Sequence, residues 1–323
     1  MNIEVVQRLH TLIDCYKGKI MKNISSYPSV LYINEDKVES ILMEDVASYL
    51  RYIQNRIASI ASNDSTACIK PKVIYDDPVH PESGDIRSMT CFTDRVKVMK
   101  IISTNPIRKK HWSVSVGATL LLDYEENHPI AIFDATNMSA IRTSAMAVLG
   151  AVFADSDLND TLIIGYGRVG SCAAKFVKEL GGNVRIYDSK LKFTDQKVED
   201  MEFIDELDRF EASTIITATT SREAFLSTEN TKADFIVSVG ADTAFNFELS
   251  SELIKDRGGL FVDCPDAAYV GDLSKIEKVD SLINGDVLDL YNLKDQAKTL
   301  VSVGSPLMDA LTVEYMAKKI GLL

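Results

Sequence analysis

The sequence Thr161-Leu162-Ile163-Ile164-Gly165-Tyr166-Gly167-Arg168-Val169-Gly170 carries the most informative motif of the protein. A short apolar run leads into a Gly-x-Gly-x-x-Gly sequence, and a helical segment, 171–180, follows it. This order is typical of the first strand, turn and helix of a dinucleotide-binding domain. Gly165 permits the tight turn, Gly167 leaves the backbone open to a pyrophosphate, and Gly170 lets the helix lie close to the strand. The helix start, with Arg168 and Val169, would offer N–H groups to the phosphates.

Asp188 strengthens this interpretation. It ends a second apolar run, 184–187, and follows Gly170 at the distance expected of a ribose-binding acid. A carboxylate there favours NAD over NADP, because a 2′-phosphate would face its negative charge. Lys190 and Lys192 weaken that discrimination. The structural alternative is a glycine-rich turn followed by a capping or solvent-facing aspartate.

The pattern of apolar runs around the glycine motif predicts a parallel sheet. Three further short apolar runs follow the glycine motif, separated by helical or polar segments. Buried strands that alternate with helices indicate a mainly parallel sheet covered on both faces. Before Arg142 the pattern is α+β: a long amphipathic helix is expected over 38–62 and β-rich runs follow it. We expect a turn or hairpin tip at 76–85 and a final helix at 307–320 that could pack back on the first domain.

Composition excludes several classes of protein. Among 323 residues there are 35 Lys and Arg and 47 Asp and Glu, which gives a formal net charge of −12. Such a chain is repelled by nucleic acid and by anionic membrane surfaces, so we expect neither as a partner. Five scattered cysteines without CxxC spacing predict no disulfide framework and no metal site, and they fit a cytoplasmic protein. No apolar run reaches the ~18 residues of a membrane span, and the first residues lack the pattern of a secretion signal.

Six segments in one order resemble the ornithine cyclodeaminase/mu-crystallin family. They cover most of the chain, so their shared order is more specific than any single motif. The segments are Pro129 to Asp134, Ser139 to Ala145, the glycine motif, Val96-Lys97-Val98 with Asn105-Pro106, Gly240-Ala241-Asp242 with Glu248-Leu249, and Gly304 with Asp309.

The resemblance implies a fold and a chemistry. It implies an α/β protein in which a Rossmann NAD-binding domain, residues 143–299, is inserted into an α+β substrate-binding and dimerisation domain, residues 1–142 plus 300–323. Reactions of the family move hydride at the carbon that bears an amino acid's nitrogen. The Pro-Ile-Ala stretch that begins at Pro129 is most similar to the 2,3-diaminopropionate and siderophore-biosynthesis dehydrogenases. The loop after Asp242 lacks the family's usual Pro-Gly-Lys, which leaves the substrate open.

The expected substrate is an amino acid, whose carboxylate needs fixed cations. Arg142 can grip it bidentately, and Lys70 resembles the cation that completes the family's clamp. Lys97 lies in an otherwise apolar strand, where a lysine either snorkels from an edge or works beside a carboxylate. Because an unpaired buried ammonium is costly, we expect Lys97 to be catalytic, with Lys100 as its rival on the opposite face. The structural alternatives are that Arg142 is a surface arginine and that Lys70 is a solvated loop lysine.

Asp242 is the expected proton acceptor. It follows the apolar run 235–239, at the edge of the sheet where ligands bind in this architecture. Its alternative is a helix cap. Thr143 and Thr219 are expected beside the cofactor, and their alternatives are a helix cap and ordinary turn chemistry.

We therefore expect a homodimeric NAD(H)-dependent oxidoreductase that transfers hydride at the Cα–N bond of an amino acid or N-carboxyalkyl amino acid. Two alternatives stay open. An ornithine or lysine cyclodeaminase would use the same site and return the hydride, so that NAD is unchanged overall. A mu-crystallin-like protein would keep the nucleotide fold and bind a ligand without catalysis.

Overall fold

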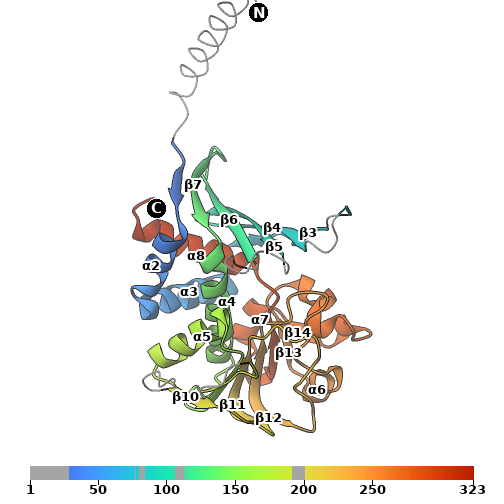
Figure 1. Ribbon diagram of the computed structural model, residues 1–323. Helices are drawn as coiled ribbons and strands as arrows, with labels where there is room; N and C mark the ends of the chain where they lie inside the picture. Colours follow the sequence, from blue (N-terminus) through green and yellow to red (C-terminus); the bar gives the residue numbers. More distant parts are fainter. Residues whose placement is uncertain (1–28, 77, 80–83, 106–112, 114, 191–200) are drawn as a thin grey trace, which may run out of the picture.

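The computed structural model describes residues 29–76, 78–79, 84–105, 113, 115–190 and 201–323. Its strands form two sheets, and Figure 1 shows the first above the second with helices beside and between them. None of the helices in these ranges is long and apolar enough to cross a membrane.

The first sheet is largely antiparallel and has one buried face. Along β5 (Lys97–Thr104) the residues Val98, Lys100 and Ile102 are buried, whereas Met99 and Ile101 are exposed. The buried face packs against α8 (Pro306–Lys319), which contacts β5 and β4 (Asp85–Thr93). The sheet order is β1 (Leu31–Ile33), β7 (Pro129–Asp134), β6 (Ser115–Leu122), β5, β4 and β2 (Ala67–Ile69), and β3 (Val73–Asp76) pairs with β4.

Two predictions for this part are refined. The segment expected to form one helix over 38–62 forms α2 (Glu35–Met43) and α3 (Val46–Ala61). The break occurs because the Asp45 side chain accepts a hydrogen bond from the N–H of Ser48 at 2.9 Å and so starts a new helix. The turn expected at 76–85 joins β3 to β4, although residues 77 and 80–83 lie outside the described ranges.

The second sheet has eight strands, and every pair in it is parallel. The sequence predicted five of them, and it missed β10, β14 and β15, which are only three or four residues long. The order is β10 (Met201–Ile204), β9 (Val184–Tyr187), β8 (Thr161–Ile164), β11 (Phe210–Thr217), β12 (Thr231–Ser238), β15 (Thr299–Val301), β13 (Leu260–Val262) and β14 (Ile283–Gly285).

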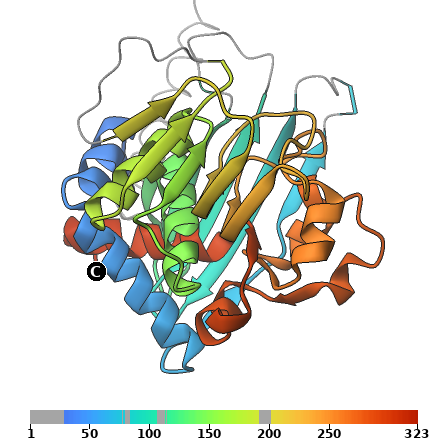
Figure 2. The same cartoon turned by 90° about the horizontal axis from the view of Figure 1, so that it is seen from below.

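Both faces of this sheet are covered, as predicted. Ile163 belongs to a core shared with α4 (Thr136–Phe153) and α5 (Arg168–Glu179), whereas the adjacent Leu162 belongs to a second core shared with α6 (Ser251–Arg257). Successive residues of a strand point to opposite faces, so two cores form. Figure 2 shows these strands from below, with the orange segment that follows β13 at one side. A short helix, α7 (Val287–Asn292), follows β14.

Helix α4 connects the two sheets. If Thr143 were a helix cap, as the sequence allowed, the helix would begin at Ser144; it begins instead at Thr136 and runs from the first sheet toward the second (Figure 1). The expected boundary at 142/143 therefore falls inside α4, and the boundary at 299/300 falls inside β15. Since α8 packs on the first sheet after the chain leaves the second, a discontinuous first domain remains our proposal.

Candidate functional site

A cavity of about 450 Å³ lies where the first sheet meets the second. Its walls come from the inner face of β4 and β5, from α4, from the glycine-rich turn, and from the loops after β11 and β12. The carboxyl ends of parallel strands are the usual place for a ligand in this architecture. The polar residues that line it include Lys72, Lys100, Arg142, Thr143, Thr219 and Asp242.

The glycine motif adopts the geometry that a dinucleotide needs. Gly165 has a φ of +94°, in the region that favours glycine. A Cβ at Gly170 would lie 1.8 Å from the carbonyl oxygen of Gly165, so the start of α5 can lie against the turn only with glycine there. A Cβ at Gly167 would meet no atom within 4 Å, and Gly167 lines the cavity. The open side of this turn, at a helix start, fits a pyrophosphate.

Asp188 lies directly after β9 and is bound to the same turn. Its Oδ2 accepts a hydrogen bond from the N–H of Tyr166 at 2.8 Å, and its Oδ1 accepts one from the N–H of Lys190 at 2.9 Å. The carboxylate is thus fixed beside the glycine motif. Lys192, the possible counter-charge, lies outside the described residues.

Two buried cations share one carboxylate in the cavity wall. The Nζ of Lys100 lies 2.8 Å from Oδ1 of Asp309, and the Nε of Arg142 donates to the same oxygen at 2.9 Å. All three side chains are at most 8% exposed. The Nη1 of Arg142 has no hydrogen-bond partner among the described residues. An unsatisfied buried donor costs about 1–3 kcal/mol, which a ligand carboxylate would offset.

Burial lowers the pKa of the Lys100 ammonium to about 7. Asp309 opposes this effect, whereas the charges of Arg142 and Lys72 add to it. Lys100 is therefore a lysine whose charge changes near neutral pH. That property makes it a candidate functional group.

The structure separates Lys97 from the cavity and brings Lys100 into it. Lys97 lies on the outer face of β5, where its ammonium contacts the carbonyl oxygen of Tyr124 and Oδ1 of Asn127. Side chains alternate along a strand, so two residues three apart must point to opposite faces. Of the two lysines that the sequence left as rivals, only Lys100 faces the cavity.

Lys70 is likewise placed away from the cavity. It is exposed, and its backbone N–H donates to the carbonyl oxygen of Thr90. Two residues later, Lys72 lines the cavity, and its Nζ donates to the carbonyl oxygen of Val303 at 2.7 Å. The nearby loop lysine is therefore the one available to a ligand.

Asp242 follows β12 by four residues and lines the cavity with a side chain that is 43% exposed. Its Oδ2 lies 3.4 Å from Nη1 of Arg87, which is itself held by Asp85 at 2.8 Å. Sequence reasoning missed Arg87. The available signal was an arginine at an alternate position of an apolar strand, next to Met89 and Cys91 on the buried face of β4.

The structure gives different outcomes for the alternatives that the sequence left open for Thr143 and Thr219. Thr143 lies inside α4, since that helix begins seven residues earlier, so it is no helix cap and it lines the cavity. Thr219 also lines the cavity, and its Oγ1 accepts from the N–H of Ser221 at 3.2 Å. Thr219 therefore makes the expected turn bond and also lines the cavity, while its place beside the cofactor stays a prediction.

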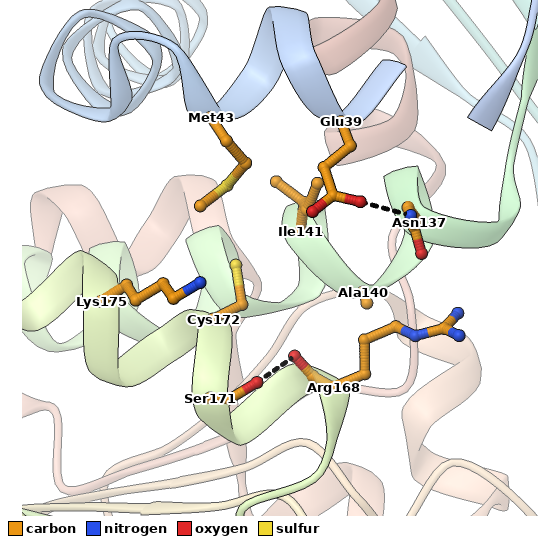
Figure 3. Close-up of a pocket in the computed structure, with 9 residues that line it drawn as sticks. All are labelled: Glu39, Met43, Asn137, Ala140, Ile141, Arg168, Ser171, Cys172 and Lys175. Carbon is orange, nitrogen blue, oxygen red and sulfur yellow. Dashed lines mark hydrogen bonds between the residues drawn. The ribbon is translucent and has the colours of Figure 1, made fainter. Parts of the chain in front are cut away.

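Arg168 and Ala140 line both the cavity and a smaller hollow of about 100 Å³. Figure 3 shows this hollow between α2, α4 and α5, with the guanidinium of Arg168 turned away from Lys175 and Cys172. The guanidinium instead donates to Oγ of Ser113 at 2.7 Å. On the far wall, the amide of Asn137 donates to Glu39 at 2.7 Å.

Comparison with known proteins decides the family. The model of the ornithine cyclodeaminase/mu-crystallin family matches residues 35–291, most of the chain. The chain belongs to this family. The family resemblance predicted from the sequence motifs is thereby confirmed.

Three relatives illustrate the similarity. The chain is 28% identical over 158 residues to the N-((2S)-2-amino-2-carboxyethyl)-L-glutamate dehydrogenase of Staphylococcus aureus, a match that spans 44% of each protein. An archaeal alanine dehydrogenase, a dimer with bound NAD, has a TM-score of 0.72 at 19% identity and covers 91% of this chain and 97% of its own. The Thermococcus litoralis Δ1-pyrroline-2-carboxylate reductase, in complex with NADH and L-proline, has a TM-score of 0.73 at 19% identity over 90% of this chain and 98% of its own. The structural likeness confirms the predicted fold class.

Proposed function

We propose that this chain is an NAD(H)-dependent oxidoreductase that transfers hydride at the Cα–N bond of an amino acid or an N-carboxyalkyl amino acid. One observation carries the proposal: a single cavity joins the glycine-rich turn of Gly167 to the buried cations Lys100 and Arg142. The first fits a dinucleotide and the second a carboxylate. The dehydrogenase and reductase relatives described above support the same chemistry.

The residues that would hold NAD are those of the glycine motif, Gly165 to Gly170, together with Asp188, Thr143 and Thr219. The helix start at Arg168, which has no side-chain cap among the described residues, would offer its first N–H groups to the pyrophosphate, and Asp188 would accept from the ribose diol. When bound, NAD supplies the hydride acceptor or donor. The residues of the chain bind, orient and move protons.

The substrate carboxylate would lie against Nη1 of Arg142 and the ammonium of Lys100, and Lys72 would add a third cation from the loop before β3. We propose Lys100 and Lys72 for the roles first expected of Lys97 and Lys70. Fixing the carboxylate positions Cα for transfer, and such orientation contributes a large part of the rate in enzymes.

Asp242 would accept the proton that leaves the substrate nitrogen as hydride departs, or return it in the reverse direction. Its carboxylate is half-exposed to the cavity, and the Arg87 guanidinium keeps it near one position. Since Arg87 is also bonded to Asp85, the arginine is anchored independently of Asp242.

We also propose a homodimer. The outer face of the first sheet exposes large apolar side chains on neighbouring strands: Val73 and Tyr75 of β3, Ile86 of β4, and Met99 and Ile101 of β5. Monomers seldom leave such a patch open to water. A second copy would cover it, and sedimentation of the purified protein tests the prediction.

The test of activity is incubation of the purified protein with NAD and single amino acids or N-carboxyalkyl amino acids. The proposal predicts NADH, followed by its near-ultraviolet absorbance, in a one-to-one ratio with a 2-oxo acid. Ammonia release without net NADH would instead show cyclodeamination. Binding without either product would identify a non-catalytic protein. Arg142→Lys serves as the matched control, since it keeps the charge and loses the bidentate fork.

A further inference from the structure

Two buried carboxyl groups, Glu248 and Asp272, lie behind the cavity at the ends of β11 and β12. Glu248 is 0% exposed and Asp272 is 2% exposed. Among the described residues, no salt bridge to Lys, Arg or His reaches either one. Burying two unneutralised anions side by side would be costly, so their proton content needs an account.

The number of hydrogen atoms available between the two carboxyl groups shows that one of them is protonated. The hydroxyl of Ser238 lies 2.6 Å from Oδ2 of Asp272 and 2.9 Å from Oε2 of Glu248. A hydroxyl carries one hydrogen, so it can donate to only one of two carboxylates. For both contacts to be hydrogen bonds, the other carboxyl group must be protonated and must donate to Ser238.

The remaining partners decide which group holds the proton. Glu248 faces donors at both oxygens: the N–H of Thr219 on Oε1 at 2.6 Å, and the Thr217 hydroxyl and the N–H of Gly240 on Oε2 at 2.7 and 2.8 Å. A carboxylate suits that set. The Oδ2 of Asp272, by contrast, has only the Ser238 hydroxyl as a hydrogen-bond partner within the described ranges, while its Oδ1 accepts from the N–H groups of Glu248 and Leu249.

The anion connects the two loops that line the cavity. Through the N–H groups of Thr219 and Gly240 it joins the chain after β11 to the chain after β12. Gly240 comes two residues before Asp242. The segment of Asp272 also packs here, because a Cβ at Gly271 would lie 1.8 Å from the carbonyl oxygen of Ala241.

We infer that Asp272 carries a proton, which it donates to Ser238, and that Ser238 donates to an ionised Glu248. This series of hydrogen bonds positions the loop of Asp242. None of Glu248, Ser238 and Asp272 is among the described residues that line the cavity, so we assign them as positioning residues. The positioning role rests on the proposed function, whereas the location of the proton does not.

Burial raises the pKa of the Asp272 carboxyl to about 7, and the charge of Glu248 raises it further, while Ser238 and two backbone N–H groups oppose the change. The pKa of Glu248 is also raised by burial. Because Glu248 accepts from four donors, we assign the anion to Glu248 and the proton to Asp272. Above neutral pH the second ionisation would place two anions on either side of one hydroxyl.

Infrared spectroscopy tests the proton without any turnover. The wild type below neutral pH should show the carbonyl band of a buried carboxylic acid, which shifts on carbon-13 labelling of aspartate and disappears in Asp272→Asn. The exposed Asp256→Asn is the matched control and should keep it. A band that shifts with labelled glutamate, or no band at all, would overturn the assignment whatever the enzyme's activity.

Two isosteric variants test the positioning role. The side-chain amide introduced by Asp272→Asn can accept at Oδ1 and donate to Ser238, as the protonated acid does. The decline of kcat that ionisation of Asp272 would cause above neutral pH should therefore disappear in this variant, whereas the rise of KM through Lys100 should remain. In Glu248→Gln the side-chain NH2 group replaces one acceptor oxygen and must face a donor that Glu248 now binds. The loop of Asp242 then loses a hydrogen bond, so kcat should fall about a hundredfold while the substrate KM changes little. Equal losses in the two variants would contradict the inference. If Glu248→Gln does not fold, Ser238→Ala replaces it, and it should lower kcat more than KM.

Discussion

The Nε of Arg142 lies 2.9 Å from Oδ1 of Asp309, although 167 positions separate the two residues in the chain. The same oxygen accepts from Lys100. Asp309 therefore neutralises one of two buried cations and leaves the second charge, together with Nη1 of Arg142, for a ligand. A carboxylate that approaches from the cavity would complete the balance of charge, and in its absence the lowered pKa of Lys100 lets the cluster lose the excess charge near neutral pH.

The two lysines of β5 provide a matched pair. Lys100→Met should lower kcat/KM about a hundredfold, because it removes a cation from the proposed carboxylate site. Lys97→Met should change it less than about threefold, because Lys97 faces away from the cavity. Steady-state kinetics and thermal melting of both variants check this. A larger loss in Lys97→Met would return the role to that residue.

The substrate KM should depend on pH through Lys100. Its folded-state pKa is about 7, below the ordinary value of 10.5, so it loses its charge as pH rises through neutrality. Attraction for the substrate carboxylate then weakens, and KM should rise above pH 7. The same depressed pKa means that the folded protein gains stability from this group as pH rises from about 7 toward 10.5, because the unfolded chain binds the extra proton there. Lys100→Arg, always charged, should flatten the KM profile; an unchanged profile would exclude Lys100 as its source.

Two glycines of the motif should respond differently to alanine. Gly170→Ala should lower the free energy of unfolding by about 2 kcal/mol or more, because its Cβ would collide with the carbonyl oxygen of Gly165. Gly167→Ala meets open space, so it should melt like the wild type and weaken NADH binding about tenfold or more by occupying the path of the pyrophosphate. Calorimetry and NADH fluorescence titration measure both effects. Tight NADH binding by Gly167→Ala would place the cofactor elsewhere.

Asp188 should set the preference between NADH and NADPH. The wild type should bind NADH more tightly, and Asp188→Asn should reduce that preference about tenfold, because it removes the charge that opposes a 2′-phosphate. The asparagine oxygen can still accept from the N–H of Tyr166, which keeps the bond to the glycine turn, whereas the bond from the N–H of Lys190 is lost. Parallel titrations of both dinucleotides check this. Preference for NADPH in the wild type would reverse our assignment.

Local patterns predicted much of the fold. The five longer or better-bounded strands of the second sheet, its glycine turn and the final helix lie where apolar periodicity indicated them. The strands β10, β14 and β15 were missed, although β8, β9 and β13 are equally short, because a strand of three or four residues shows no period and can be recognised only from the residues that bound it. The start of α4 was missed for another reason: Thr136 to Thr143 follow no amphipathic pattern, since that helix is buried on nearly all sides.

The candidate site was only partly predictable. Arg142, Asp242, Thr143, Thr219 and the glycines all line the cavity or form its turn, because motifs and strand ends locate them. The sequence predicted less well which cations near the first sheet line the cavity. Lys70 and Lys97 lie outside the cavity, whereas Lys72, Arg87 and Lys100 line it.

Local sequence patterns are enough to predict the type of sheet, the dinucleotide turn and the family, because these depend on short-range periodicity and on glycines whose backbone angles or close contacts exclude other residues. The tertiary structure was needed to show which lysine of β5 faces the cavity, which carboxylate contacts it, and that Glu248 joins two loops. Those outcomes depend on strand phase and on contacts between residues far apart in the chain, and no local pattern encodes either.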